Sequence, residues 1–232
     1  MKTAVLISGQ MRTLEGTLGS IQKHVLSRIG DYDVIAHVAE DEDAWKVEML
    51  EPRKCVVVKQ PFFDEKNYVH RSGRGVSGIQ QVLRMFWSLA ESNRLRHEVE
   101  SETGKPYDWV IRLRPDTEFF PDIEDLAACD PSNIYVPTFC NFWGYNDRFA
   151  FGGGKAMDPY HDKTQLLDTY IGEKGIYHPE SFLKWAIERA GVQVRRTETI
   201  FDTVRKNRTR IPPFWDASMG DSVPDWKRAL SA

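Results

Sequence analysis

The sequence predicts an α/β fold in which helices cover a mostly parallel central sheet. Along the first half of the chain, short apolar runs alternate with segments of helical periodicity, the order typical of βαβ units. The run at residues 3–8 is apolar almost throughout and ends at Gly9, as expected for a parallel strand buried on both faces. We therefore expect one domain over residues 1–232, with a Rossmann-like half at 1–120 and an irregular half at 121–232.

In the first half, two helices separate the strands. Apolar residues recur at helical spacing over residues 18–29 and 78–102, and Gly30 and Gly104 stand where helix C-termini are expected. Apolar runs predict strands before, between and after these helices, at residues 3–8, 33–39, 55–58 and 108–114.

The patterns of the second half are shorter. Three consecutive glycines at residues 152–154 predict a turn. Pro179 and Gly191 stand where proline and glycine are favoured, at the first position of a helix and just past its end. We expect short strands at 133–137 and 147–151, helices around 166–170 and 179–190, and a last strand at 192–195.

The composition excludes several classes of protein. Hydrophobic residues make up 41% and charged residues 28%, which rules out a disordered chain and a membrane bundle. The apolar runs are far shorter than the roughly 20 residues needed to span a bilayer. Three widely spaced cysteines favour neither a disulfide framework nor a structural zinc site, which fits a reducing cytoplasm. The net charge of −3 predicts no general attraction to nucleic acid.

The loop after the first strand is one candidate binding segment, because ligands of open α/β sheets bind beyond the carboxyl ends of the strands. This loop reads Ser8-Gly9-Gln10-Met11-Arg12-Thr13. Gly9 would let a ligand approach the backbone, while Arg12 and the N–H groups of the following helix favour an anion such as phosphate. The alternative is a plain strand-to-helix turn with a solvated arginine.

A stronger candidate for a binding site lies at the end of the strand expected at residues 108–114. There Ile111-Arg-Leu-Arg-Pro runs directly into Asp116 and Glu118. Two carboxylates at the end of a central strand can share a divalent cation with a diphosphate. Arg112 and Arg114 share one face of the strand, so one of them could reach a phosphate or pair with a carboxylate. The alternative is a structural arginine–aspartate pair.

Three segments carry a resemblance to a known family. They are Val5-Leu-Ile-Ser-Gly-Gln-Met-Arg-Thr13, Tyr107-Asp-Trp-Val-Ile-Arg-Leu-Arg-Pro-Asp-Thr-Glu118 and Tyr145-Asn-Asp-Arg-Phe-Ala-Phe-Gly152, with a weaker fourth at 178–183. Together they span about residues 4–190 and resemble the GT-A-type glycosyltransferases, in particular small bacterial and viral enzymes that decorate surface polysaccharides.

The resemblance implies a nucleotide-diphosphate sugar as donor and Mn²⁺ or Mg²⁺ as cofactor. In that family the end of the first strand holds the nucleotide, and an Asp-x-Asp/Glu motif holds the metal on the diphosphate. The sequence departs from the family pattern at Glu118, where aspartate is commoner. Carried over by position, the donor residues are Ser8, Gly9, Gln10 and Arg12, and the metal residues are Asp116 and Glu118. The place of Arg114 at the end of the strand adds it as a phosphate ligand.

A transferase that inverts the sugar also needs a carboxylate to take the proton of the acceptor hydroxyl. Asp147, just before a short apolar run, is one candidate for this catalytic base. Glu180 is the competitor, although its place near a helix N-terminus favours the ionised form. The alternatives are a surface pair of Asp147 with Arg148 and a simple helix-start glutamate.

Further candidates are less specific. Four aromatic residues at 139–145 could stack on a sugar ring or belong to the core: Phe139, Phe142, Trp143 and Tyr145. Residues 195–210 carry six basic side chains against two acidic ones, and could stabilise a departing diphosphate or form a solvated face. His37 is expected as a core histidine, while His161 and Asp162 are a conceivable pair that nothing places near the other candidates.

The expected function is therefore metal-dependent transfer of a sugar to the hydroxyl of a carbohydrate or glycolipid acceptor, in the synthesis of a surface polysaccharide or another glycan. Two alternatives stay open: a nucleotidyltransferase that makes sugar nucleotides, and a non-catalytic glycan-binding module on the same fold. We expect a cytoplasmic location, with peripheral attachment to the inner face of a membrane as a variant.

Overall fold

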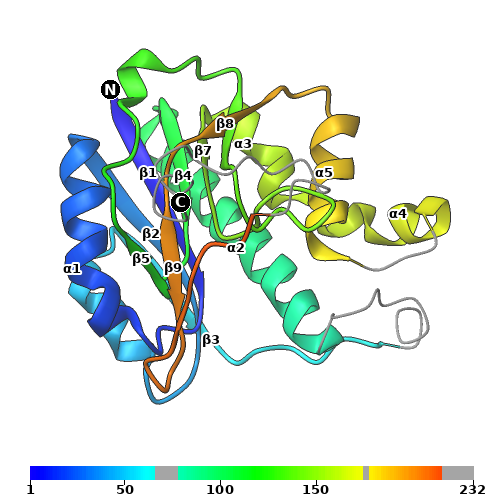
Figure 1. The fold of residues 1–232 in the computed structure, drawn as a ribbon, viewed down its shortest axis with the longest axis horizontal. Coiled ribbons are helices and arrows are strands. Elements are labelled where there is room, and N and C mark those ends of the chain that lie inside the picture. Colours follow the sequence, from blue (N-terminus) through cyan, green and yellow to red (C-terminus); the bar gives the residue numbers. More distant parts are fainter. Residues whose placement is uncertain (66–77, 175–177, 216–232) are drawn as a thin grey trace, which may run out of the picture.

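The computed structural model describes residues 1–65, 78–174 and 178–215. Its central sheet has seven strands: β1 (Lys2–Gly9), β2 (Asp31–Ala39), β3 (Lys54–Val58), β4 (Trp109–Leu113), β6 (Ile134–Pro137), β7 (Phe149–Gly152) and β8 (Val194–Thr197). The strand order is β3-β2-β1-β4-β7-β6-β8, and within this sheet only β7 runs antiparallel to its neighbours (Figure 1). The expected α/β class with a mostly parallel sheet is confirmed.

Helices cover both faces of this sheet (Figure 1). The α-helices are α1 (Leu14–His24), α2 (Ile79–Thr103), α3 (Gly154–His161), α4 (Leu167–Lys174) and α5 (Pro179–Arg189). Short 3₁₀ turns lie at η1 (Leu26–Arg28), η2 (Ala44–Leu50), η3 (Leu126–Ala128) and η4 (Lys163–Leu166). None of the helices in the described part of the chain is long and apolar enough to cross a membrane.

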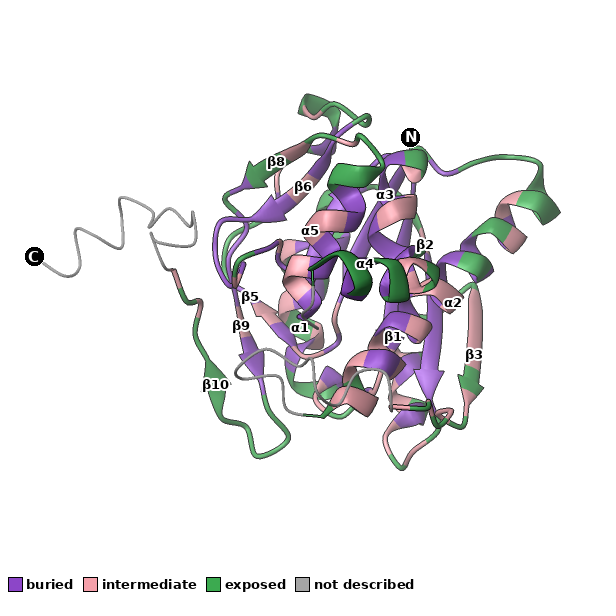
Figure 2. Cartoon of the chain, turned by 90° about the vertical axis from the view of Figure 1, so that its right-hand side faces the viewer, coloured by how far each residue is buried: buried purple, intermediate pink, exposed green. Residues whose placement is uncertain are grey.

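Alternation along the strands separates two hydrophobic cores, because successive side chains of a strand point to opposite faces. Val5 of β1 packs in one core with Leu14 of α1. Leu6, the next residue, packs in the other core with Leu95 of α2 and Met157 of α3. Figure 2 shows the result, a largely buried central sheet behind the exposed outer surface of α4. Burial on both faces explains why β1 is apolar almost throughout.

A second, small sheet lies on the α1 side and was not expected from the sequence. It contains β5 (Thr117–Phe119), β9 (Phe201–Val204) and β10 (Arg210–Ile211), in the order β10-β9-β5. Phe119 and Phe201 join the core that contains α1. The expected last strand at 192–195 forms as β8 but is followed by β9 and β10. These strands have two to four residues, too few for a period-two pattern to be visible in the sequence.

The predicted glycine turn at 152–154 is also corrected. Gly152 ends β7, and α3 begins at Gly154. A Cβ at Gly152 would lie 2.6 Å from the carbonyl oxygen of Asn133, and one at Gly153 would lie 2.4 Å from that of Pro131. These glycines therefore allow two backbone segments to approach each other, which is a different requirement from a free turn.

The order of the strands predicts where a ligand binds. The chain passes from β1 outward through β2 to β3, and then returns through α2 to place β4 on the other side of β1. Such a reversal leaves a crevice at the carboxyl ends of the two strands that flank it, the usual ligand site of open α/β sheets. The end of β1 and the end of β4 thus come together at one edge.

Candidate functional site

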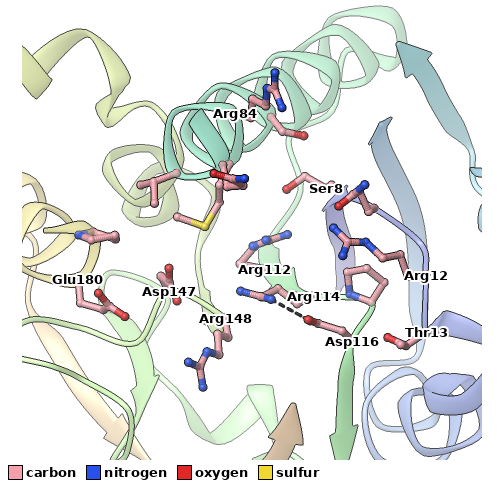
Figure 3. A pocket seen from close by; sticks show the side chains of 18 of the residues that line it. Ser8, Arg12, Thr13, Arg84, Arg112, Arg114, Asp116, Asp147, Arg148 and Glu180 are labelled. Atoms are coloured by element: carbon pink, nitrogen blue, oxygen red, sulfur yellow. Dashed lines mark hydrogen bonds and ion pairs between the residues drawn. The ribbon is translucent and has the colours of Figure 1, made fainter. Parts of the chain in front are cut away.

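A cavity of about 830 Å³ lies at the carboxyl ends of β1 and β4. It is within the range of about 300–1,000 Å³ that is common for small-molecule sites. Its wall combines residues from the ends of both strands, from α2, from the loop before β7, from the start of α5 and from the segment after β9 (Figure 3). The cavity therefore lies where the strand order predicts a ligand.

The cavity is strongly cationic. The described residues that line it include seven arginines and lysines against three carboxylates. Figure 3 shows arginines in its centre, the end of β1 on one side, and Asp147 with Glu180 on the other. The cations are Arg12, Arg84, Arg112, Arg114, Arg148, Arg205 and Lys206, and the carboxylates are Asp116, Asp147 and Glu180. Such an excess of positive charge favours a ligand that carries phosphate.

The loop after β1 forms one side of the cavity, so the structure brings Ser8, Gly9, Gln10 and Arg12 to the place expected of them. Gly9 has a φ of 104°, a conformation that side chains with a Cβ rarely adopt. The side-chain amide of Gln10 donates to Oδ2 of Asp41 at 3.0 Å, which anchors the loop to the segment after β2.

Arg114 and Asp116 form a bidentate ion pair in the wall of the cavity. Nε of Arg114 lies 2.8 Å from Oδ1 of Asp116, and Nη2 lies 2.7 Å from Oδ2. Burial alone would raise the pKa of Asp116, but the charge of Arg114 and its hydrogen bonds hold this pKa below its usual value. The structural arginine–aspartate pair, considered as the alternative for this motif, is thus present, and it lies in the cavity.

Glu118 does not reach the cavity. It lies in β5, where Nε and Nη2 of Arg210 contact its two oxygens at 2.5 and 2.9 Å. The hydrogen bond from Arg210 is the main cause that lowers the pKa of Glu118. Asp116 precedes β5 in a turn, so the change of backbone direction places the two carboxylates in different surroundings.

The expected carboxylate pair is therefore not assembled. Both oxygens of Asp116 and both of Glu118 already accept hydrogen bonds from arginines. In the described part of the chain, the one cluster of three potential ligands is His97, Asp158 and Asp162, which does not line the cavity. The two residues do not fit a shared site for a divalent cation, and metal dependence stays a prediction.

Asp147 and Glu180, the two candidate bases, lie together at one end of the cavity (Figure 3). Burial, and next the negative charge of Asp147, raise the pKa of Glu180 to about 8. Oε2 of Glu180 also lies 3.6 Å from Nδ1 of His178. Glu180 therefore keeps its proton at neutral pH. The expectation that the helix N-terminus would favour its ionised form is wrong here, because removal from water outweighs the dipole.

Two buried asparagines fix the loop that carries Asp147. Oδ1 of Asn146 accepts from the N–H of Arg148 at 2.9 Å, while its Nδ2 donates to the carbonyl of Phe139 at 2.9 Å. Oδ1 of Asn141 accepts from the N–H of Asn146 at 3.0 Å. Local turns of this kind are what asparagine favours, so its recurrence before β7 is the sequence signal that could have indicated an ordered loop.

The aromatic cluster divides between cavity and core. Phe142 and Trp143 line the cavity, and Trp143 is 60% exposed. Phe139 is fully buried in the core. Tyr145 lies under the guanidinium of Arg196, whose Cζ is 5.4 Å from its ring centre. Only the first two are therefore placed to meet a sugar.

The basic segment 195–210 divides in the same way. Arg205 and Lys206 line the cavity, and Nζ of Lys206 contacts Oε1 of Glu42 at 2.5 Å. Arg196 instead donates to Oδ1 of Asn141 at 2.8 Å, and Arg210 holds Glu118. The cationic wall draws further on Arg84 of α2 and Arg148 before β7, two residues that the sequence did not single out as anion ligands.

The histidines considered earlier lie outside the cavity wall. His37 is buried and its Nδ1 lies 2.8 Å from Oγ of Ser88, which confirms a satisfied core histidine. His161 is fully buried and its Nδ1 contacts the carbonyl of Met157 at 2.9 Å. Asp162 accepts from the amide of Asn93 at 2.8 Å. Neither His161 nor Asp162 reaches the carboxylates of the cavity wall.

Comparisons with known proteins add the following. A family model described as "Domain of unknown function (DUF7796)" matches residues 1–221. A search of curated proteins finds no significant match. Among solved structures, the apo form of the glycosyltransferase GlyE of Streptococcus pneumoniae TIGR4 is similar, with a TM-score of 0.47 and 13% identity over 84% of this chain. The chain spans 45% of the length of that structure.

Proposed function

Since the chain belongs to the DUF7796 family, a domain family of unknown function, we propose its function from the cavity itself. We propose a glycosyltransferase that moves a sugar from a nucleotide-diphosphate sugar to the hydroxyl of a carbohydrate acceptor. One observation carries the proposal: a cationic centre and a pair of carboxylates share one cavity at the β1/β4 edge (Figure 3). A departing diphosphate needs fixed positive charge, and an acceptor hydroxyl needs a base.

The donor is proposed to lie across the β1/β4 edge. The nucleotide would occupy the side formed by Ser8, Gly9 and Gln10, where the φ of Gly9 leaves the backbone open to close approach. The diphosphate would then meet Arg112, Arg114 and Arg148 in the centre, since planar guanidinium groups match phosphate oxygens. This arrangement directs the sugar toward Asp147 and Glu180.

In the proposed reaction, an oxygen of the acceptor forms the new bond to the anomeric carbon of the donor sugar. The bond from that carbon to the diphosphate breaks, and its electron pair leaves with the nucleoside diphosphate. The hydroxyl proton passes to Asp147, because Glu180 already holds a proton at neutral pH. The exposed ring of Trp143 lies beside this end of the cavity and offers a face for the acceptor sugar.

The two alternatives receive less support. A nucleotidyltransferase would need a glycine-rich, lysine-containing loop after the first strand, and residues 8–13 contain one glycine and no lysine. A glycan-binding module has no need of a buried carboxyl group beside a second carboxylate, an arrangement typical of sites that move protons.

Incubation of the chain with a panel of UDP-, GDP- and ADP-sugars tests the proposal. We expect one donor to release its nucleoside diphosphate slowly alone, and faster when a suitable carbohydrate is added. Release of pyrophosphate from a nucleoside triphosphate and a sugar 1-phosphate would indicate the nucleotidyltransferase instead. Glycan binding with no turnover of any donor would indicate the binding module.

A further inference from the structure

We infer that arginines alone hold the diphosphate in this cavity, so that the ligand binds without a divalent cation. The inference rests on the proposed function for the identity of the ligand, and on three observations for the absence of a metal requirement. These are two carboxylates already bound to arginines, several cavity arginines whose guanidinium groups have no partner among the described residues, and a buried guanidinium with one unsatisfied N–H group.

The first observation concerns Asp116, the cavity carboxylate that is paired with Arg114. Both oxygens of Asp116 are held by Arg114 at 2.7 and 2.8 Å. A cation at Asp116 would have to compete with this guanidinium, and Glu118 is bound to Arg210 in another sheet. Mg²⁺ and Mn²⁺ prefer sets of oxygen ligands, which this part of the wall does not present.

The second observation is that several cavity arginines carry positive charge that no described residue pairs with. Arg12, Arg148 and Arg205 line the cavity, and their guanidinium groups make no hydrogen bond or ion pair with any residue in the described ranges. Arg148 and Arg205 lie near enough to Asp116 that their charges lower its pKa. Arg148 and Arg205 are therefore grouped around Asp116, whose two oxygens are already held by Arg114, and this excess of positive charge favours the binding of a further anion.

The third observation is Arg112, which is 1% exposed and lines the same cavity. Its Nη1 donates to the carbonyl of Leu113 at 3.0 Å, but its Nε is buried with no partner among the described residues. Burial, with the charge of Arg114, lowers the pKa of Arg112 to about 10. A buried charge is costly, and an anion in the cavity beside Arg112 would offset that charge.

Asp116 then has a different task from ligating a metal. It neutralises Arg114 while the cavity is empty, and a diphosphate must displace it to use that arginine. This predicts an unusual response to mutation: Asp116→Asn should strengthen the binding of a diphosphate, whereas loss of a metal ligand would weaken it. Glu118→Gln, which removes the same charge outside the cavity, should leave this binding unchanged.

The experiment is isothermal titration of the whole chain with UDP, GDP, CDP, ADP and inorganic pyrophosphate, in excess EDTA and in Mn²⁺. We expect the Kd of the tightest diphosphate to differ by less than about threefold between the two conditions. Asp116→Asn should lower the Kd in EDTA. Arg148→Gln and Arg205→Gln, at partly or fully exposed positions, should each raise it by about tenfold. Arg195→Gln, exposed on β8 outside the cavity, is the charge-matched control.

The possible outcomes separate the metal-free binding of the diphosphate from the proposed transferase activity. Binding that requires Mn²⁺, or that Asp116→Asn abolishes while the variant keeps its melting temperature, overturns the inference and leaves the proposed transferase standing. Binding of pyrophosphate in EDTA without binding of any nucleoside diphosphate supports the arginine site but removes the proposed donor. Binding of none of the five anions in either condition removes both.

Discussion

Gly144 lies so close to Glu180 that a Cβ on the glycine would be 1.8 Å from the carbonyl oxygen of the glutamate. The N–H of Tyr145 donates to the same oxygen at 3.2 Å. The loop before Asp147 is thereby fastened to the first turn of α5. Within this loop Phe142 and Trp143 have φ values of 42° and 63°, which are costly for residues with a Cβ and persist only where the surroundings impose them.

Replacement of Gly144 by alanine should therefore disturb the carboxylate end of the cavity. The new methyl group must push the backbone of Glu180 away, and a displacement of about 1 Å at a reacting group can cost about a hundredfold in rate. We expect a large loss of transfer while the Kd of the nucleoside diphosphate stays the same. Gly172→Ala is the control, since nothing lies within 4 Å of the added atom. Equal losses in both variants would refute the argument.

Asp147→Asn should lower the rate of transfer by about 10²–10⁴, the usual contribution of a general base. The affinity for the nucleoside diphosphate should not fall, because the charge of Asp147 acts on Arg112 and Arg114 and opposes an anion there. Asp31→Asn, exposed at the start of β2, controls for loss of one negative charge. A smaller loss than that of Glu180→Gln would assign the base to Glu180.

Glu180 should make the stability of the protein depend on pH. Its pKa is about 8 in the folded chain, against an ordinary value of 4.5, so between these values the unfolded chain binds fewer protons than the folded one. Stability due to this group is complete below about pH 4.5 and is lost as the pH rises toward 8. The groups that face it are Asp147, Arg114, Arg148 and His178.

The glutamine of Glu180→Gln cannot ionise, so this variant should have a higher melting temperature than the natural chain at pH 8. At pH 5 the difference in melting temperature should be smaller. About 1 kcal/mol corresponds to roughly 2–4 °C in a chain of this length. Calorimetric melting curves across this range measure the difference. A constant difference at all pH values would show that Glu180 keeps an ordinary pKa.

Trp143→Ala should weaken the binding of the acceptor. The ring is 60% exposed, so its removal should cost little stability, while a sugar that stacks on it would lose about 1 kcal/mol or more of contact. We expect a higher KM for the acceptor and an unchanged Kd for the donor diphosphate. Trp45→Ala is a matched control, because Trp45 is 61% exposed and does not line the cavity. The same KM in both variants would remove Trp143 from the acceptor site.

The central elements could be predicted from the sequence because their signals are local. The apolar run of β1 and the helical period of α2 reflect burial on both faces and on one face, respectively. The helix α3 was missed, since Pro159 lies inside it and only Ala156, Met157 and Tyr160 mark its buried face besides a histidine. The strands β5 and β9 were missed because they are short and pair with each other across more than 80 residues of sequence.

By itself, the sequence determined the alternation of strands and helices, and it indicated both strand ends that form the cavity. Only the tertiary structure decided the partners of the charged groups. Asp116 and Glu118 are neighbours along the chain, yet each is bound to a different arginine, whereas Asp147 and Glu180 come from different elements and share one pocket. Charge interaction and desolvation depend on distance and on exclusion of water, and the spacing of residues along a chain specifies neither.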